Sequence, residues 1–461
     1  MRRPTSSPVI NLLIFVVVYS FCCASAVTAQ GLNQSQPESP KIMELKRRVE
    51  SGDKTAVERF WEQVRLKGTP LVEPVDVDKQ SSAVTFLWRG NAGTKNVLIM
   101  SPIFPWMMVR RQMTNLPGTD VWYKTVRAAS DQRFTYLLSE NDPRLPFADP
   151  YDWPRFKVEP VPDPLNPRKF IRPKDEDDPE DEATAMSLAE LPDAYREPLD
   201  KRDERVAAGR LEKHQLASQI LGNRRRVWVY TPPGYSNAKA YTAIVLFDGW
   251  DYLNLIPTPT ILDNLEAAGK IPPVVAVFVA NPVGEDVRAK ELTCNPKFAD
   301  FVARELMPWV RSRYRVSKNP RRVTVGGISF GGLAAAYVAL KRPDIFGNVL
   351  SQSGSFWWGP EGYVEVGEWL THQFVVGRRL PLRFYLEVGK LEVFPSTRVG
   401  IPTNLQANRH LRDVLRLKGN EVFYSEFDGA HEYINWRESL AGALQKLLGE
   451  RAAHLIESGD S

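Results

Sequence analysis

One serine in this chain stands where a nucleophile could be made. Ser329 lies between two glycines in Gly327-Ile328-Ser329-Phe330-Gly331, after the β-branched run Val323-Thr324-Val325 and before the alanine-rich run 332–340. A G-x-S-x-G sequence between a strand and a helix is typical of a nucleophile elbow, a sharp turn that lifts the serine hydroxyl out of a sheet. Glycine neighbours relieve the crowding in such a strained turn. The alternative is a glycine-rich turn that only packs a helix onto a strand.

A histidine is needed as the base, because a serine hydroxyl is a weak nucleophile near neutral pH. The chain has five histidines. Four stand elsewhere, before the predicted sheet, in an irregular stretch, in a predicted helix or in the C-terminal tail: His214, His372, His410 and His454. His431 follows the last predicted strand, in Asp428-Gly429-Ala430-His431-Glu432, which is where the histidine of this arrangement belongs. We therefore predict His431 as the base; the alternative is a surface histidine in a turn.

Two carboxylates could orient that histidine. Glu387 and Glu392 both lie in Glu387-Val388-Gly389-Lys390-Leu391-Glu392, where the predicted strand 384–386 ends. The acid of this arrangement lies between the serine and the histidine along the chain, and it holds the imidazole tautomer and stabilises the imidazolium. Glu387 still belongs to the strand, whereas Glu392 follows the glycine in the loop. The loop position favours Glu392, and a buried structural role is the expectation for Glu387.

The oxyanion formed in acyl transfer needs preorganised N–H donors. The N–H of Phe330, next to the serine, is the first candidate. The second is expected from Gly249 or Trp250, in the loop that follows the predicted strand 245–247. Asp248 begins this loop, and we expect it to brace the turn.

Two adjacent tryptophans, Trp357 and Trp358, follow the run 351–356 and are expected near the mouth of the site. Neighbouring side chains of an extended segment point to opposite sides. One tryptophan would then line a substrate pocket while the other packs, although a purely core role fits an aromatic pair equally well.

The spacing of apolar residues predicts two domains and a connection. Residues 40–140 begin with helix-period positions over 40–66, broken at Ser51-Gly52-Asp53, and continue with short alternating strands that suggest a β-sandwich. Residues 141–215 are rich in proline and in acidic side chains and are predicted to be a linker. From 216 to 450 strands alternate with helical segments, which predicts a mostly parallel sheet covered on both faces.

The N-terminus and the charge indicate where the protein acts and what it does not bind. Residues 1–29 contain two arginines, an apolar run and small residues ending at Ala26 or Ala29, which predicts a signal peptide and a periplasmic or secreted protein, with no stable membrane insertion after cleavage. The alternative is an uncleaved membrane anchor. Loss of Arg2 and Arg3 would take the formal charge from +5 to +3. So small a charge implies neither nucleic acid nor a membrane surface as partner.

Cys294 would remain as the single cysteine, so we expect no intrachain disulfide.

Longer stretches resemble the esterase D-like esterases of the α/β-hydrolase fold, and within them the enterochelin (ferric enterobactin) esterases. The likeness lies in RRRVWVYTPPGY, VLFDGWDY, VRAKEL, GGISFGGLAAAYVALKRPDIFGNVLSQSGSFWW, LEVGKLE and DGAHEYINWRESL. In the first domain, VTFLWRG, LPGTDVWY and RFTYLL are similar to the N-terminal sandwich of the same esterases, an early-set immunoglobulin-like domain. The resemblance implies Glu392 and His431 as acid and histidine. It also implies that Arg288 lies near the substrate, with a plain surface arginine as the alternative.

The leading hypothesis is an exported serine hydrolase that cleaves carboxylic esters through an acyl-enzyme. The family likeness implies a small-molecule substrate, the cyclic catecholate trilactone of a siderophore such as enterobactin. This chemistry requires no metal or other cofactor. Two alternatives stay open: an esterase of feruloyl or acetyl groups on polysaccharide, and a binding protein that keeps the fold without catalysis.

Overall fold

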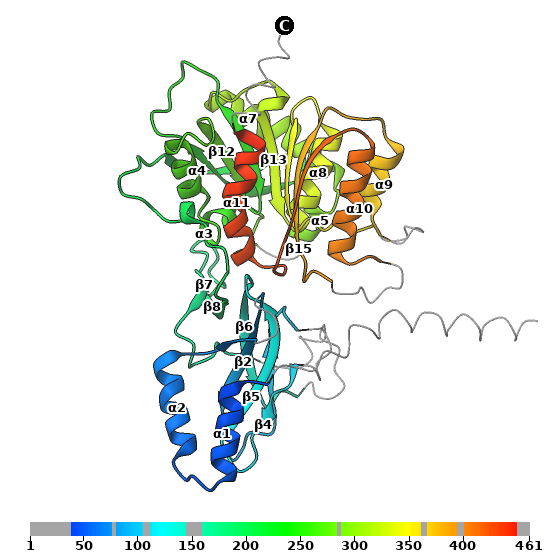
Figure 1. The fold of residues 1–461 in the computed structure, drawn as a ribbon. Coiled ribbons are helices and arrows are strands. Elements are labelled where there is room, and N and C mark those ends of the chain that lie inside the picture. Colours follow the sequence, from blue (N-terminus) through cyan, green and yellow to red (C-terminus); the bar gives the residue numbers. More distant parts are fainter. Residues whose placement is uncertain are drawn as a thin grey trace, which may run out of the picture.

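The computed structural model of the 461-residue chain describes residues 38–75, 80–104, 111–143, 159–283, 287–360, 367–393 and 401–449. A smaller first domain lies below a larger second domain in Figure 1. The predicted signal peptide, residues 1–29, lies outside the described residues. Within the described part of the chain, no helix is both long and apolar enough to cross a membrane.

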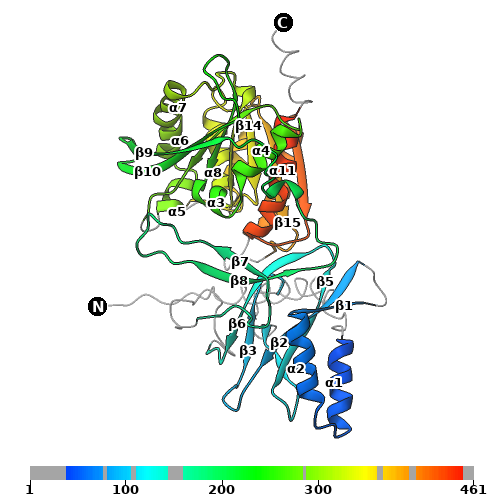
Figure 2. The ribbon, with the colours of Figure 1, turned by 90° about the vertical axis from the view of Figure 1, so that its left-hand side faces the viewer.

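The first domain is a sandwich of two antiparallel four-stranded sheets, with the strand orders β1-β2-β5-β4 and β3-β6-β8-β7. Phe86 of the first sheet and Phe134 and Tyr136 of the second meet in the core between them. Leu87, the next residue along, points to the other face, where helices α1 and α2 cover it with Leu45 and Trp61 (Figure 2). The elements are α1 (Pro40–Glu50), α2 (Ala56–Lys67), β1 (Leu71–Pro74), β2 (Ser81–Arg89), β3 (Val97–Met100), β4 (Thr114–Asn115), β5 (Val121–Ala129), β6 (Arg133–Glu140), β7 (Lys169–Arg172) and β8 (Thr184–Glu190).

The stretch 141–215, expected to be a linker, contributes strands to both domains. Strands β7 and β8 complete the second sheet of the sandwich, and β9 begins the large sheet of the second domain. The acidic run between β7 and β8 is also held in place, because Asp175 and Asp177 form ion pairs with Arg226 at 2.6 and 2.7 Å. A run of acidic residues forms a solvated loop when no basic side chain pairs with it. Here the basic partner is Arg226, which lies in a strand some 50 residues away.

The second domain is built on one eight-stranded sheet with the order β16-β15-β14-β13-β11-β12-β10-β9. Strands β11 to β16 are parallel to one another, and only the β12-β10 and β10-β9 pairs are antiparallel. The strands are β9 (Arg210–Ser218), β10 (Asn223–Thr231), β11 (Thr242–Phe247), β12 (Val274–Val279), β13 (Val323–Ile328), β14 (Asn348–Gln352), β15 (Arg383–Gly389) and β16 (Glu421–Phe427). The predicted mostly parallel sheet is therefore present.

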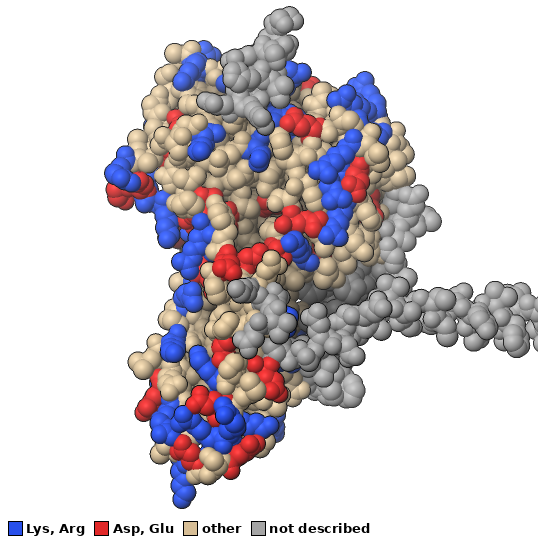
Figure 3. Space-filling view, in the orientation of Figure 1, with Lys and Arg blue, Asp and Glu red and all other residues tan. Residues whose placement is uncertain are grey.

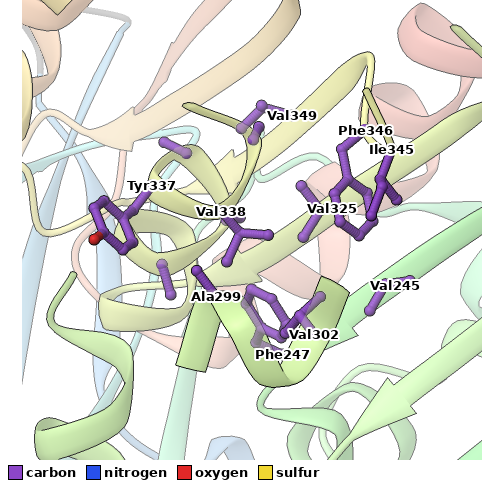
Figure 4. Packing of buried hydrophobic residues seen from close by; sticks show 14 of the residues in the cluster. Val245, Phe247, Ala299, Val302, Val325, Tyr337, Val338, Ile345, Phe346 and Val349 are labelled. Carbon is purple, nitrogen blue, oxygen red and sulfur yellow. The ribbon is translucent and has the colours of Figure 1, made fainter. Parts of the chain in front are cut away.

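Helices cover both faces of this sheet, so its central strands are apolar on both sides. In β11, Val245 packs toward the helices α5 to α10, whereas Ile244 and Leu246 pack toward α3, α4 and α11. Figure 4 shows part of the first layer, where Val338 of α8 lies against Val325 of β13. The helices are α3 (Gly249–Asn254), α4 (Thr258–Ala267), α5 (Val287–Leu292), α6 (Pro296–Phe301), α7 (Met307–Arg313), α8 (Phe330–Lys341), α9 (Trp369–Val376), α10 (Asn404–Leu417) and α11 (Tyr433–Leu448).

The carboxyl ends of the parallel strands face the first domain (Figure 1). Helix α3, which follows β11, reaches it, because the Arg172 guanidinium of β7 lies 4.7 Å from the ring centroid of Trp250. The loop after β16 reaches it too, because Glu432 accepts a hydrogen bond from the Thr135 backbone at 3.1 Å. On the face seen in Figure 3, lysine, arginine and acidic side chains are mixed over both domains.

Candidate active site

The predicted nucleophile lies at a strained turn between β13 and α8. Ser329 has φ 55° and ψ −120°, a conformation that is costly for any residue other than glycine. Its backbone N–H donates to the carbonyl of Gln352 at 3.0 Å. A Cβ added at Gly327 would lie 2.4 Å from the backbone carbon of Gly331, so the two glycines let the strand and helix cross closely. The sharp strand-to-helix turn expected at Ser329 is therefore present.

The Ser329 hydroxyl lies beside a second hydroxyl, that of Ser355, with 3.3 Å between the two Oγ atoms. Among the hydrogen bonds of the described residues, none joins Ser329 to His431. Catalytic hydrogen bonds in unliganded enzymes are often long and tighten only with substrate bound.

The predicted base and the predicted acid are directly bonded. His431 Nδ1 lies 2.7 Å from Glu392 Oε2, and the side chains are 38% and 2% exposed, respectively. The imidazole ring stands edge-on against the indole of Trp436, with 4.8 Å between centroids and an interplanar angle of 89°. The imidazole is thus held by a buried carboxylate at Nδ1 and by an aromatic ring, and among the described residues it is hydrogen-bonded only through Nδ1.

Glu392 is kept ionised by its surroundings. Burial by itself would raise the pKa of Glu392. The neighbouring His431 and the hydrogen bonds that Glu392 accepts outweigh burial, so its pKa lies below the ordinary value. Besides His431, the donors are Ser353 Oγ at 2.5 Å, the Gly389 N–H at 2.8 Å and Asn404 Nδ2 at 2.6 Å. A carboxylate with this many donors is an anion suited to stabilising an imidazolium.

Glu387 occupies a different, closed environment. It is 1% exposed and accepts hydrogen bonds from Gln352, Ser439 and Tyr385 at 2.8, 2.5 and 2.9 Å. Burial raises its pKa to about 7 despite these donors. The structure thus pairs Glu392 with the histidine and gives Glu387 the contacts of a buried structural carboxyl.

The loop expected to complete the oxyanion site is tightly built. Asp248 is left-handed, with φ 55° and ψ 45°, and precedes α3. A Cβ at Gly249 would lie 2.5 Å from the backbone of Phe278, so only glycine fits there. The Asp248 carboxylate is 0% exposed and is bound by Arg288 through two hydrogen bonds of 2.7 and 2.8 Å. Asp248 therefore braces this turn, and Arg288 is its partner.

The three predicted substrate-binding residues have different positions. The Arg288 guanidinium lies 5.7 Å from the Phe330 ring centroid, beside the nucleophile, although Asp248 engages it. Trp357 also packs on Phe330, at 6.1 Å between centroids, whereas Trp358 packs on Trp369 at 6.4 Å. The tryptophan pair lies in a turn closed by the Trp358 N–H and the Ser355 carbonyl, not in the extended segment expected.

Sequence reasoning missed the polar residues that surround the predicted ones. Ser353 and Ser355 lie just after β14. Polar residues after a parallel strand lie at the same sheet edge as Ser329, so the position of these two serines could have indicated that they belong to the site. Asn404 begins α10 and offers no such signal. Across the described residues, no group of three or more His, Cys, Asp or Glu side chains is arranged to hold a metal ion.

Fold and site together define a chain of the α/β-hydrolase class. Residues 218–447 match the family described as putative esterase, and residues 83–200 match the family described as enterochelin esterase, N-terminal. An iron(III) enterobactin esterase of Escherichia coli O6:H1 is 30% identical over 385 residues, which cover 78% of this chain and 90% of that protein. The chain belongs to the enterochelin (enterobactin) esterase family.

Solved structures agree with this assignment. The enterobactin esterase from Shigella flexneri, determined in the presence of enterobactin, is 28% identical and superposes with a TM-score of 0.66 over 86% of this chain and 98% of that one. The ferric enterobactin esterase from Salmonella typhimurium is 27% identical, with a TM-score of 0.68 over 84% of this chain and 98% of that one. The family resemblance and the fold class inferred from the sequence are confirmed.

The raised pKa of Glu387 gives a testable pH dependence of stability. The folded protein holds the Glu387 proton more tightly than the unfolded chain does, so protonation of Glu387 stabilises the fold. This contribution to the unfolding free energy is complete below the ordinary pKa of a glutamate and is lost as the pH rises through about 7. Between pH 5 and 8 the unfolding free energy of the wild type should fall by up to about 3 kcal/mol more than that of Glu387→Gln. Denaturant titrations at both pH values measure this. Glu432 has a similarly raised pKa, so some dependence should persist in the variant; identical pH slopes in the two proteins would contradict the assignment.

Proposed function

We propose that this chain hydrolyses carboxylic esters through an acyl-enzyme formed on Ser329. The observation that carries the proposal is the 2.7 Å bond between His431 Nδ1 and Glu392, at the same sheet edge as the serine elbow, in a chain of an esterase family. With Nδ1 bound to the carboxylate, Nε2 is the nitrogen that would receive the serine proton.

The proposed steps follow the usual acyl-transfer sequence. The Ser329 hydroxyl gives its proton to His431 as its oxygen attacks the ester carbonyl, and the backbone N–H of Phe330 with that of Gly249 or Trp250 stabilises the oxyanion. His431 then protonates the departing alkoxide, which leaves an acyl-serine. Water attacks this ester with His431 again as base, releasing the acid. Glu392 stays ionised throughout and stabilises the imidazolium.

Three variants test the catalytic residues and discriminate between the two carboxylates. Ser329→Ala should abolish hydrolysis of p-nitrophenyl acetate together with the pre-steady-state burst of p-nitrophenol. Glu392→Gln should lower kcat by about 10³–10⁴-fold because the imidazolium loses its counter-charge. Glu387→Gln is the matched control and should keep kcat within about threefold. Turnover that survives in Ser329→Ala, or equal losses in both glutamate variants, would contradict the mechanism.

We further propose that the substrate is a catecholate siderophore with ester linkages. Support comes from the relatives: besides the enterobactin esterases, an iron(III) salmochelin esterase of Escherichia coli O6:H1 is 26% identical over 433 residues, which cover 91% of this chain and 100% of that protein. The correspondence extends over both domains, so it includes the sandwich as well as the hydrolase domain.

The substrate proposal predicts the products of a direct incubation. Ferric enterobactin, iron-free enterobactin and feruloylated arabinoxylan are incubated separately with the protein, with Ser329→Ala as the control. Mass spectrometry should show that enterobactin gains one water per ester cleaved and ends as its monomer, while ferulate release stays at the level of the control. Release of ferulate with intact enterobactin would overturn the substrate proposal and leave the esterase mechanism standing.

We also propose that the protein acts outside the cytoplasm. The basic, apolar and small-residue pattern of residues 1–29 supports export. In a bacterial host, the mature protein recovered from the periplasm or medium should begin after Ala26 or Ala29 when its N-terminus is sequenced. A full-length chain confined to the cytoplasmic fraction would contradict this.

A further inference from the structure

The loop that carries His431 is bound by the first domain. Glu432, the next residue, accepts a hydrogen bond from the backbone N–H of Thr135 at 3.1 Å and another from the Thr135 hydroxyl. Thr135 lies in β6 of the sandwich, 297 positions earlier in the chain. The contact therefore joins the two domains one residue away from the proposed base.

The helix that follows the loop is held by the same strand. Arg133, two residues before Thr135 in β6, is 4% exposed and forms ion pairs with Glu190 of β8 at 2.9 Å and Glu438 of α11 at 2.5 Å. Buried ion pairs of arginine are sensitive to geometry, because each unpaired charge would be costly. Strand β6 thus fixes α11, which begins at Tyr433, as well as the residue before it.

Docking of the domains does not depend on the Thr135 contact alone. Phe170 of β7 is buried against Leu255 and Ile434 of the second domain, and Arg172 lies over Trp250. These contacts would keep the sandwich in place if the Thr135 hydroxyl were removed. The Thr135 hydroxyl can therefore act locally, by fixing the course of the loop that carries His431.

We propose that Thr135, through Glu432, is a positioning residue that sets how far the His431 ring reaches toward Ser329. The inference rests on the proposed function of His431 as base. The His431 side chain is 38% exposed and, within the described structure, is hydrogen-bonded only through Nδ1, so the course of its loop also helps to place the ring. Small errors in the placement of a catalytic group cost large factors in rate. Hence Thr135 contributes to catalysis through the position of the base.

The test compares two valine substitutions in the same domain. Thr135→Val keeps the shape and removes the hydroxyl bound to Glu432. Thr125→Val is the control, because it removes a hydroxyl that is hydrogen-bonded at 2.9 Å to Thr85 of the neighbouring strand β2, within the first sheet. For p-nitrophenyl acetate, Thr135→Val should lower kcat about tenfold with KM within about twofold, whereas the control should keep both. Thr135→Ser should restore kcat.

A cycle with Glu432→Ala tests whether Thr135 acts through that residue. The double variant should lose no more activity than the worse single variant, with melting temperatures showing that all proteins are folded at the assay temperature. Equal kcat in Thr135→Val and Thr125→Val, or additive losses in the cycle, would overturn the proposal.

A readout independent of turnover separates this proposal from the proposed function. The proton between His431 Nδ1 and Glu392 can be followed by NMR, with the signal assigned by its loss in His431→Gln. It should shift or broaden in Thr135→Val and stay unchanged in Thr125→Val. If Ser329→Ala kept full turnover, the proposed function would fail, while this signal would still decide whether Thr135 positions the ring; an unchanged signal in Thr135→Val would refute it.

Discussion

The bond between His431 and the buried carboxylate of Glu392 is the interaction on which the site depends. A carboxylate that is 2% exposed is stable as an anion only when donors replace the water it has lost. Ser353, just after β14, Gly389 of β15 and Asn404 of α10 supply those donors. Three separate segments of the second domain must therefore come together before Glu392 is a stable partner for His431. The fold brings them together.

The proposed nucleophile, Ser329, depends on a second constraint, the close crossing of two backbones. The strained Ser329 is held because β13 and α8 meet at Gly327 and Gly331, and because its N–H is tied to Gln352 of the neighbouring strand. The turn proposed to complete the oxyanion site is built in the same way, with Gly249 packed against Phe278 and the Asp248 carboxylate paired with Arg288. A strained backbone conformation of this kind persists only where the surrounding packing leaves the residue no alternative. The large doubly covered sheet supplies that packing.

The sandwich domain is part of this arrangement and not an appendage. Strand β6 contacts the loop after β16, and β7 contacts α3, so both flanks of the proposed site border the first domain. The family match includes this domain as well as the hydrolase domain. In our proposal, one consequence of having two domains is that the position of the base is set partly from outside the sheet.

The sequence alone determined the class of fold and the kind of chemistry, because both depend on local patterns. The glycines around Ser329, the order of serine, acid and histidine, and the apolar runs of the strands are all read from neighbouring residues. Local pattern also favoured Glu392 over Glu387, in agreement with the observed bond to His431. It could not show that residues 169–190 complete the sandwich, since β8 finds its partner strand β6 only in the folded chain. The contact between Thr135 and Glu432 is likewise a product of domain packing, because nothing in either segment specifies a partner 297 positions away.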